Sequence, residues 1–267
     1  MKHCAVIGNP IEQSKSPTIH QNFAQQFGLS LHYNKMLSTP KQFEQDVTGF
    51  FNNGAIGLNV TAPFKQQAFD MADSLSDKAK LASAVNTLYI EEGKLVGDTT
   101  DGRGLVRDLL FNNIDINNKV VLLIGAGGAA RGCVMDLLEQ NPKKLIICNR
   151  TLAKAEAIVS VVNDPRCEAV SFEDVPRNCQ LVINSTSCSL SNEIPNIDVL
   201  RFANAEVAYD MSYKSETTSF NAWIEQNTQA KTIDGLGMLI EQAAESFRIW
   251  HGQLPDTTSL RAILRAV

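Results

Sequence analysis

The sequence predicts an α/β protein of two domains, each built on a mostly parallel sheet with helices on both faces. Three observations support this prediction. Short runs rich in Val, Ile and Leu alternate with amphipathic stretches along the whole chain, which is typical of βαβ units. A chain of 267 residues is expected to form about two domains. A fresh series of strands begins at Val120 and runs into a glycine-rich turn.

Nine short aliphatic runs, often bounded by Gly, Asn or Pro, are the predicted strands. In chain order they are residues 4–7, 32–37, 55–60, 87–90, 120–124, 145–148, 181–183, 207–209 and 231–233. The predicted helices are residues 17–27, 40–52, 103–112, 129–139, 152–162, 217–226, 238–251 and 258–265. Ser16, Thr39 and Thr151 are expected to cap three of these helices, and Pro63 is expected to open a further helix.

Two glycine-rich interruptions, at residues 98–104 and 234–237, divide this pattern. They predict a first domain of residues 1–101 and a second domain of residues 102–237. The helical stretch of residues 238–267 follows a complete α/β unit. We expect these C-terminal helices to pack back on the first domain and complete it.

Composition and charge exclude several classes of protein. The chain is 44% hydrophobic and 20% charged, so it can bury a core and is not intrinsically disordered. Its 24 Lys and Arg against 29 Asp and Glu give a net charge of -5, which argues against a nucleic-acid-binding protein. No apolar run approaches the roughly 18–20 residues that a membrane span requires.

The six cysteines are scattered without a C-x-x-C motif, and the four histidines form no cluster with metal-ligand spacing. We interpret the cysteines as small buried hydrophobic residues in a reducing compartment, and we expect no metal site. The N-terminus has too few apolar residues for a signal peptide, so the predicted location is cytoplasmic.

The strongest local motif is a buried strand that runs into G-x-G-x-x-A and then into a helix, from Val120 onward. This is the context of the dinucleotide-binding fingerprint. Gly125 allows the tight turn, Gly127 lets the backbone approach a pyrophosphate, and Ala130 allows close packing of helix on strand. The helix start supplies free N–H groups for the phosphates. A purely structural strand-to-helix turn is the alternative.

The next strand of this unit ends in Asn149, Arg150 and Thr151, with Lys154 one turn later. An NAD site usually has an acidic residue here that binds the ribose 2′-hydroxyl. A guanidinium at this place suits a 2′-phosphate, so the sequence favours NADP over NAD. The alternative is that Arg150 is a solvated surface cation and Thr151 only a helix cap.

The first hundred residues carry small polar side chains where predicted strands end. The set is Ser14, Ser16, Asn59, Thr61, Lys65, Asn86 and Asp101. Ligands of open α/β sheets bind at the carboxyl ends of strands, so the set favours a small polyhydroxylated ligand. Lys65 falls in a first helical turn, where a cation is disfavoured by the helix dipole. Each residue also has a structural interpretation: Ser16 and Asp101 as caps, Lys65 as a solvated lysine.

These motifs, in this order, resemble those of the shikimate dehydrogenase family. The matching stretches are residues 8–11, 14–17, 59–65, 84–87, 98–102, 125–129, 149–151, 210–213, 234–239 and 241–244, with His20. The resemblance implies an NADP-dependent oxidoreductase that reversibly reduces 3-dehydroshikimate to shikimate on the route to chorismate and the aromatic amino acids. It implies that the first domain binds substrate and that the second is a Rossmann-like NADP domain. Family members are monomers or homodimers.

The resemblance also implies roles for individual residues. Lys65 and Asp101 would be the catalytic pair, and Ser14 and Ser16 would bind the substrate carboxylate. The remaining substrate-binding residues would be Asn59, Thr61, Asn86, Tyr213 and Gln242. The cofactor-binding residues would be Asp77, Gly125, Ala126, Gly127, Gly128, Ala129, Asn149, Arg150, Thr151, Lys154, Thr186, Met211, Gly235 and Met238.

Three departures from the family pattern are visible. Gln13 stands where many members have His, residues 184–190 lack a usual glycine, and Ser212 replaces a common Ile or Val. Two alternatives stay open: a quinate/shikimate dehydrogenase with relaxed cofactor use, and a non-catalytic shikimate-binding sensor. The intact Lys65 and Asp101 argue against the sensor. A folate-linked dehydrogenase is disfavoured because residues 59–65 offer no apolar stacking surface.

Overall fold

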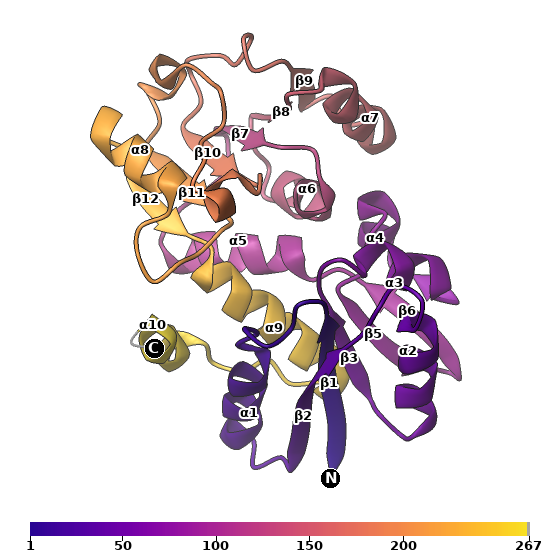
Figure 1. The fold of residues 1–267 in the computed structure, drawn as a ribbon. Helices are drawn as coiled ribbons and strands as arrows, with labels where there is room; N and C mark the ends of the chain where they lie inside the picture. Colours follow the sequence, from indigo (N-terminus) through magenta and orange to yellow (C-terminus); the bar gives the residue numbers. More distant parts are fainter. Residues whose placement is uncertain (266–267) are drawn as a thin grey trace. The chain divides into compact units, whose positions relative to one another are not determined.

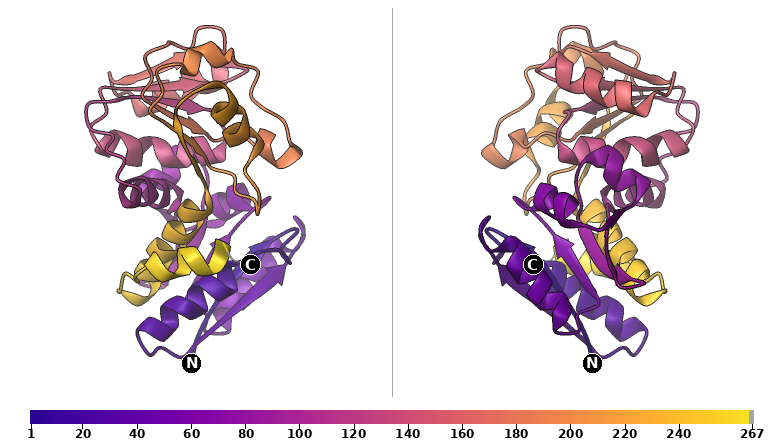
Figure 2. Two further views of the ribbon diagram at one scale, coloured as in Figure 1. Left: turned by 90° about the vertical axis from the view of Figure 1, so that its left-hand side faces the viewer. Right: turned by 90° about the vertical axis from the view of Figure 1, so that its right-hand side faces the viewer.

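The computed structural model describes residues 1–265 and divides them into two compact units (Figure 1). Unit 1 consists of residues 1–104 and 240–265, and unit 2 consists of residues 105–239. The C-terminal helices therefore belong to the first unit, as the sequence predicts. Figure 2 shows them in yellow beside the indigo and purple elements of unit 1. Within the described residues, no helix combines the length and apolar character needed to cross a membrane.

Unit 1 is built on a six-stranded sheet with the order β2-β1-β3-β5-β6-β4. The strands are β1 (Lys2–Gly8), β2 (Leu31–Leu37), β3 (Gly57–Val60), β4 (Ser74–Leu75), β5 (Thr87–Glu91) and β6 (Lys94–Asp98). The prediction of a mostly parallel sheet is wrong for β5, which runs antiparallel to both β3 and β6. A two-residue hairpin turn at Glu92 and Gly93, which both have positive φ, joins β5 to β6 and makes this pair antiparallel. β4, β6 and this turn were not predicted from the sequence.

Helices cover both faces of this sheet. Successive side chains of β1 point to opposite faces and so enter two different cores. Ala5 and Ile7 pack into one core with residues of α2, α3 and α4, and Cys4 and Val6 pack into another beside Trp250. The helices of unit 1 are α1 (Ser16–Gln26), α2 (Phe43–Asn52), α3 (Lys65–Met71), α4 (Asp77–Ala82), α10 (Thr258–Arg265) and, from residue 240, α9 (Leu236–His251). Neither α3 nor α4 was delimited from sequence, although the start of α3 after Pro63 was expected.

Helix starts differ in detail from the predicted caps. Ser16 is the first residue of α1 and not its cap, and the Ser14 hydroxyl accepts a hydrogen bond from the Ser16 amide. α2 begins at Phe43, because residues 40–42 form a turn. Thr151 does stand at the N-cap of its helix, but its hydroxyl makes no capping hydrogen bond.

Unit 2 has six parallel strands in the order β12-β11-β10-β7-β8-β9. The strands are β7 (Val120–Ile124), β8 (Lys144–Cys148), β9 (Cys167–Val170), β10 (Leu181–Asn184), β11 (Val207–Asp210) and β12 (Lys231–Asp234). In chain order this is the doubly wound dinucleotide-binding arrangement, with its switch point between β7 and β10. The helices are α5 (Asp101–Phe111, in this unit from residue 105), α6 (Gly128–Glu139), α7 (Leu152–Val162), α8 (Ser219–Asn227) and the short 3₁₀ helices Cys188–Ser191 and Val199–Phe202.

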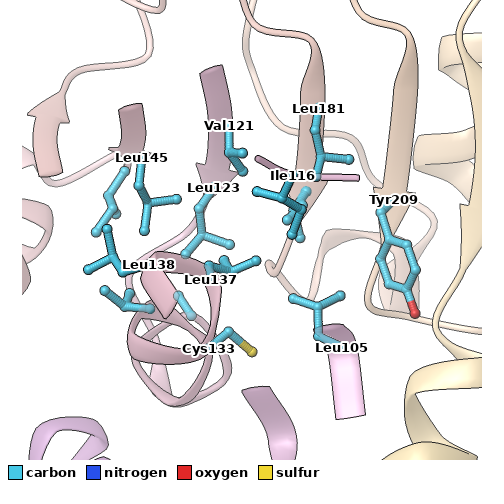
Figure 3. Packing of buried hydrophobic residues seen from close by; sticks show 14 of the residues in the cluster. Leu105, Ile116, Val121, Leu123, Cys133, Leu137, Leu138, Leu145, Leu181 and Tyr209 are labelled. Carbon is cyan, nitrogen blue, oxygen red and sulfur yellow. The ribbon is translucent and has the colours of Figure 1, made fainter. Parts of the chain in front are cut away.

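The core of unit 2 explains why its strands are continuously apolar. Every residue of β7 is buried, and successive residues enter opposite cores. Val121 and Leu123 pack with Leu137 of α6 on one face (Figure 3), and Leu122 packs with Phe220 on the other. A parallel strand buried on both faces loses the alternating pattern of a half-exposed strand.

His20, in unit 1, gives a prediction for the pH dependence of stability. It is fully buried and stacked on Tyr33 at a ring distance of 4.3 Å, and burial lowers its pKa from 6.5 to about 3. As the pH falls through 6.5, His20 therefore becomes protonated in the unfolded chain but stays neutral in the folded protein. We expect the free energy of unfolding to fall between pH 6.5 and 4, by up to ~1.4 kcal/mol per pH unit from this group.

The variant His20→Phe keeps a stacked ring and removes this titration. Its unfolding free energy, measured with urea at several pH values, should fall less steeply than that of the wild type. Parallel curves for the two proteins over this range would contradict the prediction.

Candidate active site

Lys65 and Asp101 form an ion pair at the carboxyl-end edge of the unit 1 sheet. Lys65 is the first residue of α3. Asp101 is the first residue of α5 and follows the end of β6 after two linking residues. The Lys65 Nζ lies 2.6 Å from Asp101 Oδ2. The side chains are 32% and 12% exposed, so the pair is partly shielded and still open to a ligand. The carboxylate offsets the unfavourable position of the Lys65 cation in a first helical turn.

Asn86 holds the other oxygen of this carboxylate. Its Nδ2 donates to Asp101 Oδ1 at 2.8 Å. Its Oδ1 accepts from the Thr100 backbone N–H at 2.9 Å and from the Thr87 hydroxyl at 2.8 Å. Two donors on Oδ1 leave only one orientation of the amide, with Nδ2 toward Asp101. Asn86 precedes β5, and because β5 is antiparallel its start lies at the same edge as the ends of β3 and β6.

Gln242 reaches the same network from α9. Its Oε1 accepts from Asn86 Nδ2 at 3.3 Å and from the Thr100 hydroxyl at 3.4 Å. Gly104 permits this approach, since a Cβ there would lie 2.7 Å from the Cβ of Gln242. The part of α9 from residue 240 onward therefore completes the polar site of unit 1.

Asn59 connects the network to the serine turn. It is buried at the end of β3, and its Oδ1 accepts from the Tyr33 hydroxyl at 2.8 Å. Burial raises the pKa of Tyr33 well above its usual value, and a hydrogen bond to Ser16 acts in the opposite direction. Ser16 in turn accepts from the Ser14 hydroxyl at 3.2 Å. Ser14, Ser16 and Asn59 are thus brought together.

Among the described residues, no hydrogen bond joins the other expected substrate residues to this network. Thr61 is half-buried just after β3, and its backbone N–H donates to the Ile7 carbonyl. Tyr213 belongs to unit 2, where burial raises its pKa. Asp77, expected at the cofactor, begins α4; its side chain is 97% exposed and pairs with Lys80.

Four network residues were not recognised as site residues from sequence. They are Tyr33, Thr87, Thr100 and Ser246. Ser246 follows Gln242 by four residues on α9, and this spacing on one helix face could have indicated it. Thr87 and Thr100 stand inside the matching motifs. Tyr33 lies within β2 and has no local signal.

The glycine-rich turn of unit 2 has the geometry of a phosphate cradle. Gly125 has a φ of +110°, and a Cβ there would meet Ser185 Oγ at 2.5 Å. Gly127 and Gly128 face open space, with no atom within 4 Å of an added Cβ. The first amides of α6 follow directly, so backbone N–H groups and a positive helix end meet an open surface. These residues fit a dinucleotide pyrophosphate.

The end of β8 carries the expected cationic set. Arg150, Thr151 and Lys154 are exposed, and Asn149 Nδ2 donates to the Thr151 carbonyl at 2.8 Å. Within residues 1–265, Arg150 forms no ion pair. The unpaired Arg150 guanidinium lies beside the Thr151 hydroxyl, which makes no capping bond, and beside a helix N-terminus. These groups together fit a phosphate monoester.

The loop that departs from the family pattern is held by side chains. The buried Ser189 donates to Asp210 Oδ2 at 2.6 Å, and Asn184 Nδ2 donates to Asp210 Oδ1 at 3.2 Å. Thr186 is fixed in turn, since its hydroxyl donates to Asn184 Oδ1 at 2.7 Å. The loops after β10 and β11 are thereby joined without the usual glycine.

Met211, Gly235 and Met238 lie close to this loop pair in unit 2. A Cβ on Gly235 would stand 2.0 Å from the Met211 carbonyl oxygen, so only glycine allows the approach. Met238 is buried in the core against which Met211 packs.

Comparison with known proteins identifies the family. The chain is 46% identical, over 98% of its length and 95% of the relative's, to shikimate dehydrogenase (NADP(+)) of Colwellia psychrerythraea. The chain belongs to the shikimate dehydrogenase family. Its residues 6–88 match the shikimate dehydrogenase substrate binding domain, residues 108–201 match shikimate / quinate 5-dehydrogenase, and residues 235–265 match the shikimate 5'-dehydrogenase C-terminal domain.

Two solved structures share the fold of this chain. An Ael1 enzyme from Pseudomonas putida has a TM-score of 0.96 at 39% identity, over 99% of this chain and 98% of that chain. Shikimate 5-dehydrogenase from Thermus thermophilus, in complex with NADP(H) and shikimate, has a TM-score of 0.89 at 28% identity, over 100% and 99%. The predicted family and fold class are confirmed.

Proposed function

We propose that this protein catalyses the reversible, NADPH-dependent reduction of 3-dehydroshikimate to shikimate. The Lys65–Asp101 pair, held by Asn86 at the ligand edge of the sheet, is the observation that carries the proposal. The curated relatives with which the chain shares 46% identity are named shikimate dehydrogenase (NADP(+)), and the Thermus thermophilus structure holds NADP(H) and shikimate.

Bound NADPH would supply a hydride to the carbonyl carbon of 3-dehydroshikimate. Lys65 as an ammonium donates the proton that the carbonyl oxygen then needs, and in the reverse direction neutral Lys65 accepts it. Asp101 orients Lys65 and stabilises its charge, since Oδ2 lies 2.6 Å from Nζ. Asn86 keeps the carboxylate in place because its Nδ2 donates to Asp101 Oδ1.

The remaining residues bind and orient. Ser14 and Ser16 would hold the substrate carboxylate, because their hydroxyls stand together at the start of α1. The proposed contacts to ring hydroxyls are Asn59, Thr61, Asn86 and Gln242, and Tyr213 would help close the substrate pocket. For the cofactor, residues 125–129 would hold the pyrophosphate. The adenosine end would be held by Asn149, Arg150, Thr151 and Lys154. The nicotinamide end would lie along Thr186, Met211, Gly235 and Met238, with Asp77 near the cofactor.

Initial rates of nicotinamide reduction test this function, with shikimate or quinate each paired with NADP or NAD. Activity confined to shikimate with NADP is the expected result. Comparable rates with quinate or NAD would place the protein among quinate/shikimate dehydrogenases. No turnover in any pairing, from folded protein that still binds shikimate, would indicate a sensor.

The cradle gives a second prediction through Gly127. An alanine Cβ there meets open space in the protein alone but would occupy the place of the pyrophosphate. We expect Gly127→Ala to keep the melting temperature and to weaken NADP binding about 10-fold or more, because overpacking costs roughly 1–3 kcal/mol. Fluorescence titration and thermal melting measure the two effects.

Gly49→Ala is the matched control, since Gly49 in α2 also faces open space. It should leave NADP binding unchanged and slightly raise stability, because alanine favours a helix interior over glycine. Unchanged NADP affinity in Gly127→Ala would contradict the cradle.

A cytoplasmic location is part of the proposal. All six cysteines are free thiols and five of them are buried, which fits a reducing compartment.

A further inference from the structure

Ser246 lies at a junction of four polar groups in unit 1. It is fully buried on α9, and its Oγ is 2.9 Å from Asn59 Nδ2, 2.8 Å from Thr87 Oγ1 and 3.3 Å from Thr100 Oγ1. Its hydroxyl also reaches the Gln242 carbonyl at 3.1 Å, the usual partner of a serine within a helix. A serine that only filled helix surface would need the last contact alone.

The direction of these hydrogen bonds can be assigned. Asn59 Oδ1 accepts from Tyr33, so the Asn59 amide presents its Nδ2 to Ser246, whose oxygen must accept. The second hydrogen of this Nδ2 points to the Asn86 carbonyl at 3.2 Å. The Asn59 amide nitrogen is therefore fully used within the protein.

On its other side, Ser246 contacts the group that orients Asn86. Thr87 donates its one hydroxyl hydrogen to Asn86 Oδ1, so its oxygen is left as an acceptor toward Ser246. The one Ser246 hydrogen has two acceptors, the Thr87 hydroxyl at 2.8 Å and the Gln242 carbonyl at 3.1 Å, and we assign it to the shorter contact. The Ser246 hydroxyl then places the Thr87 hydroxyl, and Thr87 together with the Thr100 N–H turns the Asn86 Nδ2 toward Asp101. The bonds through Asn59, Ser246, Thr87 and Asn86 then run from donor to acceptor in one direction and end on the Asp101 carboxylate, while the Gln242 carbonyl is a competing acceptor for the Ser246 hydrogen.

We propose that Ser246 is a positioning residue for the substrate site, which acts through Thr87 to fix the Asn86 amide toward Asp101 and the ligand. The proposal rests on the proposed function, because it takes Asn86 to be a ligand-binding group. It also extends that function, since α9 then contributes a buried hydroxyl in addition to Gln242. Asn59, with both N–H groups engaged, would support Ser246 and offer the ligand at most an acceptor.

The first test is Ser246→Ala, measured as KM and kcat for shikimate and KM for NADP. The loss of one oriented hydrogen bond is expected to raise the KM for shikimate about 3- to 10-fold. The KM for NADP should stay within about twofold, since the residues expected to bind the cofactor phosphates and nicotinamide lie in unit 2. A merely structural serine would lower the melting temperature without this split between the two KM values.

Thr257→Val is the matched control. Thr257 is also buried in unit 1 and donates to a residue of α9, Glu241 Oε1, at 2.6 Å, but within residues 1–265 it has no bond to the network. It should lower the melting temperature and leave both KM values unchanged. An equal rise in the KM for shikimate in Ser246→Ala and Thr257→Val would overturn the proposal.

A coupling test examines the route through Thr87. Thr87→Val alone should raise the KM for shikimate, and the double variant should resemble Thr87→Val, because contacting residues on one route are not additive. Effects of Ser246→Ala and Thr87→Val that multiply would overturn the route. Thr87→Val also serves if Ser246→Ala does not fold: an unchanged KM for shikimate in this variant would then overturn the proposal.

Calorimetric titration of the wild type and each variant with shikimate, in the absence of NADP, measures the Kd for shikimate without turnover. A wild type that binds shikimate but does not reduce NADP would refute the proposed function alone. An equal Kd for wild type and Ser246→Ala would refute the positioning role alone.

Discussion

Replacing Lys65 with alanine is expected to lower kcat for shikimate oxidation about 10²- to 10⁴-fold, the usual loss when a general acid–base group is removed. The substituted side chain can neither accept the proton of the substrate hydroxyl nor donate it in the reverse reaction. Stopped-flow or steady-state rates with NADP measure the effect. The KM for NADP should change little, since Lys65 belongs to unit 1 and the glycine-rich turn to unit 2.

The matched control for Lys65→Ala is Lys144→Ala. Lys144 also forms a 2.6 Å ion pair, with Glu168, but the pair is exposed and lies at the start of β8. An exposed ion pair contributes only about 0–1 kcal/mol to stability, so this variant should keep wild-type turnover. Near wild-type turnover in a folded Lys65→Ala protein would remove Lys65 from the proposed chemistry.

The second large effect is expected for Arg150→Ala, on cofactor choice. A hydrogen bond to a charged group contributes about 1.5–3 kcal/mol, so kcat/KM with NADP should fall roughly 10- to 100-fold. The value with NAD, which has no 2′-phosphate, should stay within about twofold. The ratio of the two specificity constants is therefore the decisive measurement.

Arg177→Ala is the control for this change. Arg177 is also exposed in unit 2, but it precedes β10 and so lies at the opposite edge of the sheet from the ends of β7 and β8. It should leave both specificity constants unchanged. An equal loss with NADP and NAD in Arg150→Ala would mean that Arg150 does not bind a 2′-phosphate.

The nucleotide-binding turn could be predicted from sequence because its signal is local. The strand, the glycine that needs positive φ and the following helix are contiguous, and each is set by backbone sterics or by burial on both faces. Gly125 has the predicted conformation, and the position of Lys65 in a first helical turn also follows from its neighbour Pro63.

Some local signals gave wrong details. Ser16 has a good capping side chain, yet Ser14 supplies the hydroxyl that accepts from the first helical amide. Because residues 40–42 form a turn, α2 begins at Phe43 and not at Pro40. Residues 184–190 lack a family glycine, and a buried hydrogen bond from Ser189 to Asp210 holds this segment. A residue type alone does not show which of several near partners it will bond.

The sequence by itself determined the α/β class, the dinucleotide-binding turn and the polar residues at the strand ends, because these depend on periodicity and on neighbours in the chain. Only the tertiary structure decided how those residues join. The antiparallel β5 brings Asn86 to the edge that holds Asp101, and Ser246 meets Asn59 across 187 residues and Thr87 across 159. Such bonds depend on the packing of α9 against the sheet, and no local pattern encodes the distance between groups so far apart in the chain.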